Sequence, residues 1–249
     1  ETFYAEAKDA DCLIYNSTIE GELQTLDELL QKNPLLAILR NVPLEVIEEY
    51  TSCILNGGVS FFEVALNSNH ALDEIKLLKK IFGKQALIGA GTVITSELAG
   101  KAVDAGADFL LSPSADVPVL EYCEKHEIAL IPGALTPSDV TKCMAYGFYD
   151  IKLFPADVMP ASYIRSLKGP LSVTEYMAIG GVNRDNIQSF FKAGYLAAGL
   201  GSNLLPMEVR KEKDWETGSA YVRMLMEKIR EVLRRVWKYR QRKMTHTGF

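Results

Sequence analysis

One lysine stands in the middle of an apolar segment, Asp150-Ile-Lys-Leu-Phe-Pro-Ala156. In a strand here, Lys152 and Phe154 share one face and Ile151 and Leu153 the other, because side chains alternate along a strand. If both faces are covered, Lys152 is buried, and a buried ammonium is costly unless it is paired or loses its proton. A neutral amine is a nucleophile that attacks carbonyl groups, so the segment predicts Schiff-base chemistry.

A glutamate and an arginine stand in two further apolar segments, at residues 61–66 and 35–40. An apolar surround raises the pKa of Glu63, which suits a carboxyl group that must take and return a proton. The Arg40 guanidinium lowers the pKa of a nearby Lys152, and its planar fork matches a carboxylate. Together they predict a substrate with a keto group next to a carboxylate. A purely structural ion pair between Glu63 and Lys152 is the alternative.

Two glycine-rich segments, Ile179-Gly-Gly-Val-Asn183 and Gly199-Leu-Gly-Ser202, each follow an apolar run. Glycines leave backbone N–H groups unobstructed, and the predicted helix starts that follow favour anions. A lone Gly-Gly pair is more often a simple turn, but its place after the last two apolar runs favours a phosphate site.

These residues lie in or just after short apolar runs that repeat along the chain. Each run is followed by a polar or glycine-containing loop, a helix of about three turns and a glycine. Runs that are apolar on both faces suit parallel strands covered on both sides. The runs occupy residues 35–40, 61–66, 86–92, 109–113, 129–133, 151–154, 176–181 and 196–201.

Eight such units predict an α/β fold, a (β/α)8 TIM barrel. A doubly wound open sheet is the second architecture, but its usual G-x-G-x-x-G turn is absent after the first run, where the chain reads Leu39-Arg-Asn-Val-Pro43. Strand alternation also places Ile88, Ala90 and Thr92 on one face, with small side chains that leave space near the barrel mouth.

The carboxyl ends of barrel strands form one active face, whatever the reaction. The residues at these ends are therefore expected to lie together. They are Arg40, Glu63, Thr92, Pro113, Lys152, Gly180, Gly181 and Ser202.

The two ends of the chain fall outside the repeat. Residues 1–20 read as an N-terminal extension, residues 21–233 as the barrel, and residues 234–249 as a basic helix end and tail. A capping box of Thr25 and Glu28 predicts a short helix that ends before Pro34. One long helix is expected from Tyr221 to about Lys243, and its basic second half is interpreted as solvated, with an acidic neighbour or nucleic acid as alternative contacts.

Composition restricts the function classes further. The 249 residues are 48% hydrophobic with a formal net charge of -5, which favours a globular protein without general attraction to nucleic acid or an anionic membrane. Four scattered cysteines and three separated histidines predict no disulfide framework, no metal site and a cytoplasmic location. No cofactor is expected.

The apolar runs and their polar residues together resemble the 2-keto-3-deoxy-6-phosphogluconate (KDPG) aldolase family, with its relatives that act on the galactonate epimer and on 4-hydroxy-2-oxoglutarate. The resemblance covers nearly all of residues 34–205, in order and at family-like spacing. The matching segments are Ala37–Arg40, Phe62–Leu66, Ile88–Val93, Leu111–Pro113, Ile131–Gly133, Lys152–Ala156, Gly180–Val182 and Gly199–Ser202.

The resemblance implies that Lys152 forms the Schiff base and that Glu63 is the general acid and base, acting through water. It implies substrate contacts from Arg40 and Thr92 to the carboxylate, from Pro113 to the pocket wall, and from Gly181 and Ser202 to the phosphate. Family members are class I aldolases that need no metal and are commonly trimers. Cleavage of the phosphogluconate substrate, or of its galactonate epimer, to pyruvate and glyceraldehyde 3-phosphate is therefore expected. A homotrimer that binds a phosphorylated keto-deoxy sugar acid is therefore expected.

Two positions depart from the gluconate-type pattern: Asn67 stands where many members have arginine, and Ile179 where they have threonine. Both look closer to the galactonate branch, so the epimer stays open, with Asn67 as a substrate-binding candidate. Two other functions also stay open. One is a phosphosugar isomerase or epimerase with Glu63 as base and Lys152 as an electrostatic clamp, and the other is a non-catalytic scaffold that retains the barrel.

Overall fold

The structure, a computed structural model, describes Ile14–Tyr15 and residues 24–246, with side chains described for residues 29–236. Most of the expected extension at residues 1–20 lies outside this range. Within it, β1 (Ile14–Tyr15) pairs antiparallel with β2 (Gln24–Thr25).

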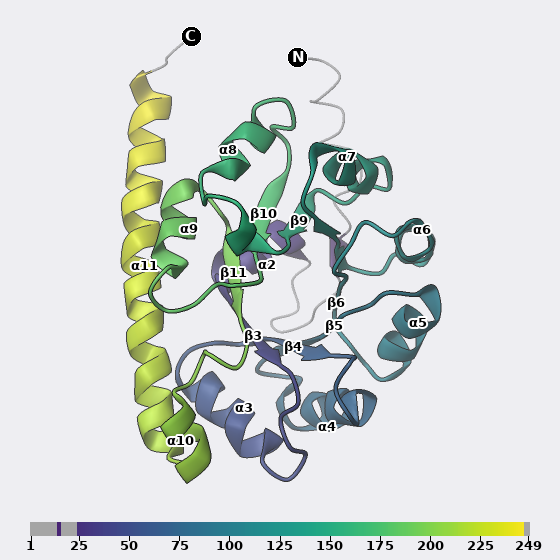
Figure 1. The fold of residues 1–249 in the computed structure, drawn as a ribbon, viewed down its shortest axis with the longest axis vertical. Helices are drawn as coiled ribbons and strands as arrows, with labels where there is room; N and C mark the ends of the chain where they lie inside the picture. Colours follow the sequence, from purple (N-terminus) through teal and green to yellow (C-terminus); the bar gives the residue numbers. More distant parts are fainter. Residues whose placement is uncertain (1–13, 16–23, 247–249) are drawn as a thin grey trace.

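All eight apolar runs form strands, and every pair between them is parallel (Figure 1). The order around the sheet is β7-β6-β5-β4-β3-β11-β10-β9-β8. The predicted TIM-like barrel is therefore confirmed. The strands are β3 (Leu35–Leu39), β4 (Phe61–Ala65), β5 (Leu87–Gly91), β6 (Leu110–Leu111), β7 (Leu130–Ile131), β8 (Gly133–Ala134), β9 (Asp150–Leu153), β10 (Glu175–Ala178) and β11 (Ala197–Leu200).

The fifth predicted run is divided into β7 and β8 by Pro132, which has no N–H group to donate to a ladder. β7 pairs with β6, and β8 pairs with β9. The Pro132 carbonyl still accepts a hydrogen bond of 2.9 Å from the backbone N–H of Lys152. The interruption lies between β7 and β8, and the barrel stays nearly closed beside β9, the strand that carries Lys152.

Helices alternate with the strands and cover the outside of the barrel (Figure 1). The helix expected before Pro34 is confirmed as α2, and Thr136 and Asp139 form a capping box at the start of α7. The helices are α2 (Leu26–Lys32), α3 (Ile47–Asn56), α4 (Ala71–Phe82), α5 (Ser96–Asp104), α6 (Val117–Lys125), α7 (Pro137–Ala145), the 3-10 helix η1 (Ala156–Val158), α8 (Tyr163–Lys168), α9 (Ile187–Ala193), α10 (Met207–Glu212) and α11 (Trp215–His246).

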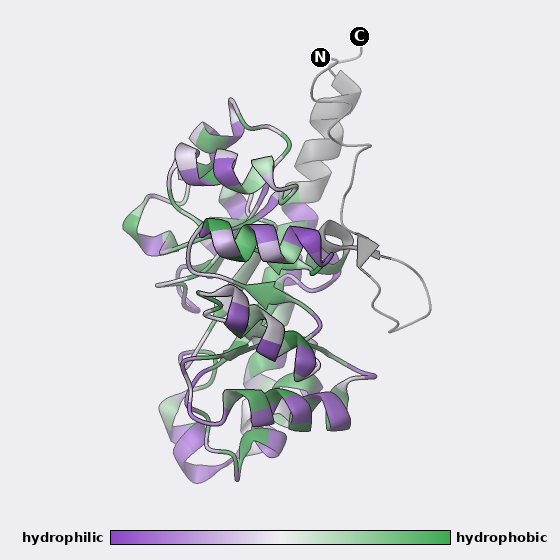
Figure 2. Ribbon diagram, turned by 90° about the vertical axis from the view of Figure 1, so that its right-hand side faces the viewer, coloured by the Kyte–Doolittle hydropathy of each residue, from purple (hydrophilic) through white to green (hydrophobic). Residues whose placement is uncertain are grey.

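Two apolar cores follow from the alternation of side chains along the strands. One lies inside the barrel and contains Phe61, Phe109 and Met177, with Leu29 and Leu30 of α2 packed against it. The other lies between the strands and the surrounding helices. Figure 2 shows this layering, with apolar strands in the centre and polar residues on the outer faces of the helices.

The long final helix, α11, begins at Trp215 rather than at the predicted Tyr221. The expected long helix is confirmed, and the buried side chains of Val222, Leu225, Met226 and Ile229 form an apolar stripe along it. These pack against α3 and α9, so α11 runs along the side of the barrel (Figure 1). No helix in the described part of the chain is long and apolar enough to cross a membrane.

Candidate active site

Lys152 lies on β9 and points into the barrel. Ile151 and Leu153 pack in the outer core, whereas Phe154 belongs to the inner one, as strand alternation predicts. The lysine side chain is only 5% exposed, and its Nζ lies 5.1 Å from the centre of the Phe154 ring. Burial lowers the pKa of Lys152, which increases the fraction of neutral amine.

Glu63 lies on β4 and is fully buried. Its strand neighbours are Ile38 of β3 and Gly89 of β5. The carboxyl group rests directly over Gly91, where a Cβ atom would overlap it. Neither carboxyl oxygen has a hydrogen-bond partner among the described residues. Burial therefore raises the pKa of Glu63, which favours a group that exchanges protons.

The charges of Lys152, Glu63 and Arg40 act on one another. Lys152 and then Arg40 oppose the effect of burial on the pKa of Glu63. Glu63 raises and Arg40 lowers the pKa of Lys152. Within the part of the chain that the structure describes, however, no ion pair closer than 4.0 Å joins Lys152 to Glu63. The three groups thus share one electrostatic environment without direct pairing of the acid and the amine.

The other candidate residues follow the carboxyl ends of parallel strands, so they lie on one face of the barrel. Arg40 is exposed just after β3, Thr92 just after β5, and Pro113 after β6. Gly180 and Gly181 follow β10, and Ser202 follows β11.

Thr92 does not lie where strand alternation placed it. Ile88 and Ala90 pack in the outer core, so the expectation that this face opens the barrel mouth is wrong. On the inner face, Gly89 and Gly91 instead leave room that the Phe109 ring and the Glu63 carboxyl group occupy. Thr92 itself has φ 61°, a left-handed conformation that is strained for a β-branched residue. This turn in the backbone brings its Oγ1 to 3.4 Å from Oδ1 of Asn67, to which it donates a hydrogen bond.

The loop after β6 is fixed by a serine that the sequence did not single out. Ser112 is buried, and its hydroxyl donates to the Ser114 carbonyl at 2.7 Å and accepts from the Gly133 N–H at 3.2 Å. Gly133 packs directly on the backbone of Pro113, where a side chain would not fit. Pro113 is thereby held between the end of β6 and the start of β8, at the barrel mouth.

The loops after β10 and β11 are joined. Asn203 donates from Nδ2 to the Val182 carbonyl at 2.9 Å. Gly180 and Gly181 both have positive φ, at 92° and 67°, and Gly181 packs against the carboxylate of Asp157. Since α9 and α10 are short, binding of an anion here would depend on backbone N–H groups rather than on helix dipoles. Asp157 was missed in the sequence, although it follows the lysine segment directly.

His70 precedes α4 and His126 follows α6, and both are exposed. Among the described residues, no group of three His, Cys, Asp or Glu side chains is placed to hold a metal ion.

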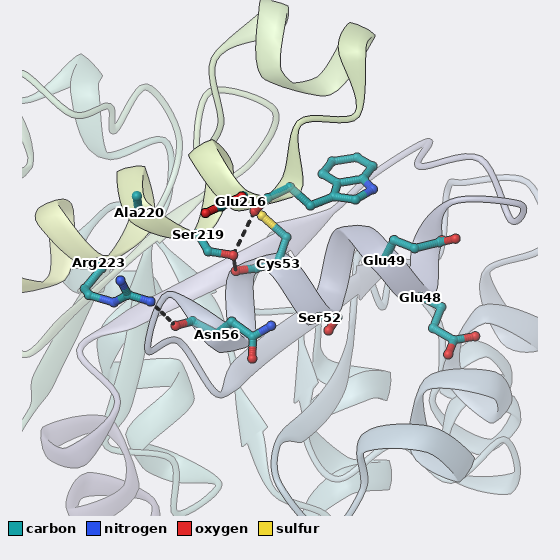
Figure 3. A pocket seen from close by; sticks show the side chains of 10 residues that line it. Glu48, Glu49, Ser52, Cys53, Asn56, Glu216, Ser219, Ala220 and Arg223 are labelled. Atoms are coloured by element: carbon teal, nitrogen blue, oxygen red, sulfur yellow. Dashed lines mark hydrogen bonds between the residues drawn. The ribbon is translucent and has the colours of Figure 1, made fainter.

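A pocket of about 740 Å³ lies elsewhere, on the outer surface between α3 and α11 (Figure 3). Its floor is held by hydrogen bonds from Ser219 Oγ to the Cys53 carbonyl at 3.0 Å and from Arg223 to the Asn56 carbonyl at 3.3 Å. Neither Lys152 nor Glu63 lines it. The chemistry-bearing residues and this pocket are therefore separate features.

Comparison with known proteins places the chain among aldolases. The sequence model of the KDPG and KHG aldolase family matches residues 26–220. The 2-dehydro-3-deoxy-6-phosphogalactonate aldolase of Escherichia coli strain K12 is 28% identical over 199 residues, which cover 80% of this chain and 97% of that protein. The KHG/KDPG aldolase of the same organism is 28% identical over 191 residues, covering 76% and 89%.

A solved structure is similar as well. The KDPG aldolase of Legionella pneumophila, with pyruvate captured as a covalent carbinolamine intermediate, superposes with a TM-score of 0.74. The two chains are 27% identical, and the match covers 81% of this chain and 98% of that one. The chain therefore belongs to the KDPG and KHG aldolase family, whose members are class I aldolases and hence lyases.

Proposed function

We propose that this protein cleaves 2-keto-3-deoxy-6-phosphogluconate, or its galactonate epimer, to pyruvate and glyceraldehyde 3-phosphate, with Lys152 as the nucleophile. The observation that carries the proposal is the burial of one amine and one carboxyl group inside the same barrel, each shifting the pKa of the other. The covalent pyruvate adduct named for the Legionella relative supports the same class of intermediate.

The neutral amine of Lys152 adds to the C2 ketone of the substrate, and loss of water gives a protonated imine. The imine accepts the electron pair of the C3–C4 bond as that bond breaks, which leaves an enamine on Lys152. Glu63, as carboxylate, takes the proton of the C4 hydroxyl through a water molecule, and the aldehyde departs. Protonated Glu63 then returns a proton to C3, and hydrolysis of the imine releases pyruvate and the free amine.

Both ends of the substrate have candidate partners. Arg40 and Thr92 hold the carboxylate next to the ketone, since a guanidinium binds a carboxylate through two parallel hydrogen bonds. Pro113 lines the wall of the substrate site between the two ends of the substrate. The backbone N–H groups at Gly180 and Gly181, with the hydroxyl of Ser202, bind the phosphate.

The galactonate epimer is supported by Asn67 and Ile179. Asn67 accepts the hydrogen bond from Thr92, so its amide lies beside the residue assigned to the carboxylate. The phosphogalactonate aldolase of E. coli is as similar to this chain as the KHG/KDPG aldolase of that organism, so overall identity favours neither epimer. The resemblance of Asn67 and Ile179 to the galactonate branch favours the galactonate form.

We further propose that residues 21–233 form the aldolase domain, that residues 1–20 and 234–249 are appendages, and that the protein is a cytoplasmic homotrimer. The boundary at residue 233 falls within the continuous helix α11. Three of the four cysteines lie among the described residues, and all three are buried free thiols, in keeping with a reducing compartment.

The test measures the release of pyruvate from each epimer in an assay coupled to lactate dehydrogenase. The proposal predicts turnover of at least one epimer by the wild-type protein and a loss of turnover in Lys152→Arg, which keeps the charge but cannot form the imine. Release from neither epimer, or equal turnover by Lys152→Arg, would refute it.

A further inference from the structure

The loop after β10 is held between the lysine strand and the long helix α11. On one side, a side chain at Gly180 would press on Pro155 and on the ring of Phe154. On the other side, the guanidinium carbon of Arg184 lies 3.9 Å from the centre of the Tyr221 ring of α11. The loop thus connects the segment that follows Lys152 to a helix on the outside of the barrel.

Asparagines make the loop internally rigid. Asn186 donates from Nδ2 to the Gly181 carbonyl at 2.9 Å, and its Oδ1 accepts from the Asn183 N–H at 2.8 Å. The Asn183 Oδ1 in turn accepts from the N–H groups of Asp185 and Asn186, at 2.9 and 3.1 Å. Arg184 lies between Asn183 and Asp185, so its backbone is part of this hydrogen-bonded loop, which reaches Gly181.

The charges in this loop pose a problem for an anionic ligand. The carboxylate of Asp157 packs on Gly181, and Asp185 lies in the loop itself. Arg184 is the cation of this loop, and no ion pair closer than 4.0 Å neutralises it within the described part of the chain. Its positive charge is therefore available to offset the two carboxylates when a phosphate dianion approaches.

We infer that Arg184, stacked on Tyr221, is a positioning residue for the phosphorylated end of the substrate and that α11 thereby takes part in substrate binding. The inference rests on the proposed aldolase function. The Tyr221 ring holds the Arg184 guanidinium by a cation–π contact. The guanidinium in turn holds the loop and offsets the negative charges of Asp157 and Asp185. Neither residue touches the reacting carbons, so the effect is confined to binding of the phosphate.

The test is a double-mutant cycle of Arg184→Gln and Tyr221→Ala, read out as kcat/KM for the phosphorylated sugar acid. Each single change is expected to raise KM roughly three- to tenfold with little change in kcat, the range that a partly exposed cation–π contact supports. The double variant is expected to match the single ones, because either change already removes the pair. Tyr221→Phe keeps the ring and is expected to behave as wild type.

Two controls separate this role from general damage to α11. Arg223→Ala removes the contact of α11 with the Asn56 carbonyl on α3, away from the loop, and is expected to leave KM unchanged. Exchange of the methyl protons of pyruvate with solvent requires the imine but no phosphate. That exchange is expected to be unchanged in Arg184→Gln and Tyr221→Ala.

Additive effects of the two substitutions, an unchanged KM in both, or an equal loss of pyruvate exchange would overturn the inference. These results differ from failure of the proposed function. Wild-type protein that neither exchanges pyruvate protons nor cleaves the phosphorylated acid would overturn the aldolase mechanism, and the role of Arg184 with it.

Discussion

The amine of Lys152 and the carboxyl group of Glu63 lie inside one barrel, on β9 and β4, and each shifts the pKa of the other without an ion pair closer than 4.0 Å among the described residues. A direct ion pair would hold both groups charged. The separation instead allows Lys152 to act as a neutral nucleophile and Glu63 to carry a proton.

Replacement of Glu63 by glutamine keeps the size of the side chain and removes its titration. We expect kcat for cleavage to fall by roughly 10²- to 10⁴-fold, the usual contribution of a general acid or base. Borohydride is still expected to trap pyruvate on the protein, while exchange of the pyruvate methyl protons is lost. Wild-type exchange in Glu63→Gln would show that another group moves the proton.

Replacement of Arg40 by glutamine removes the guanidinium assigned to the carboxylate. We expect KM for pyruvate in the exchange reaction to rise about 10- to 100-fold, the value of a charge-assisted hydrogen-bonded pair. Because Arg40 also lowers the pKa of Lys152, its loss is expected to move the midpoint of Schiff-base formation at saturating pyruvate to higher pH. A midpoint that stays fixed or moves to lower pH would contradict this electrostatic role.

Replacement of Gly91 by alanine places a Cβ atom on the carboxyl group of Glu63. We expect overpacking to lower the free energy of unfolding by about 1–3 kcal/mol and to displace Glu63, so that kcat falls as well. Gly169→Ala is the matched control, because Gly169 ends α8 with ordinary contacts and negative φ. If Gly91→Ala loses no more activity than Gly169→Ala, the close packing of Glu63 on β5 does not matter for catalysis.

Glu74 of α4 is a buried acid outside the barrel interior, only 1% exposed, and one of its oxygens has no hydrogen-bond partner among the described residues. Burial raises its pKa from 4.5 to about 7, which the nearby His70 partly opposes. Between these two pH values the native state keeps a proton that the unfolded chain releases, so stability falls as pH rises.

Glu74→Gln is therefore expected to flatten the decline of the melting temperature between about pH 4.5 and 7. The measurement is thermal unfolding across that range, with Glu97→Gln on the exposed face of α5 as the comparison. An equally steep decline in Glu74→Gln would assign the pH dependence to other groups.

Strand positions could be predicted because a buried parallel strand appears in the sequence as a short run of apolar residues. The runs around Glu63 and Lys152 are apolar on both faces, and each polar residue in them stands out against its neighbours. The assignment of Phe154 to the same face as Lys152 followed from alternation alone. The barrel, and with it the common face of the strand ends, follows from this pattern.

Backbone conformation was harder to predict than strand position. Alternation holds only while the chain stays extended, and the left-handed φ of Thr92 ends it at that residue without a glycine to indicate the change. The division at Pro132 was likewise invisible in hydropathy, since both halves are apolar. These local departures decide how Thr92 and Pro113 face the barrel mouth.

The start of α11 was missed for a packing reason. Gly218 is unfavourable in a helix, so the apolar stripe is evident only after it. In the structure this glycine lies against Cys53 of α3, where a Cβ atom would overlap the sulfur. A tertiary contact therefore selects the residue that local propensity disfavours, and no pattern within the segment indicates it.

The nucleophile itself is tested most directly by reduction with borohydride in the presence of pyruvate, followed by peptide mass spectrometry. The buried amine of Lys152 predicts one reduced pyruvate adduct, on the peptide that contains Lys152, and none in Lys152→Ala. Labelling of a different lysine, or an unlabelled Lys152 in a wild-type protein that cleaves its substrate, would contradict the Schiff-base mechanism.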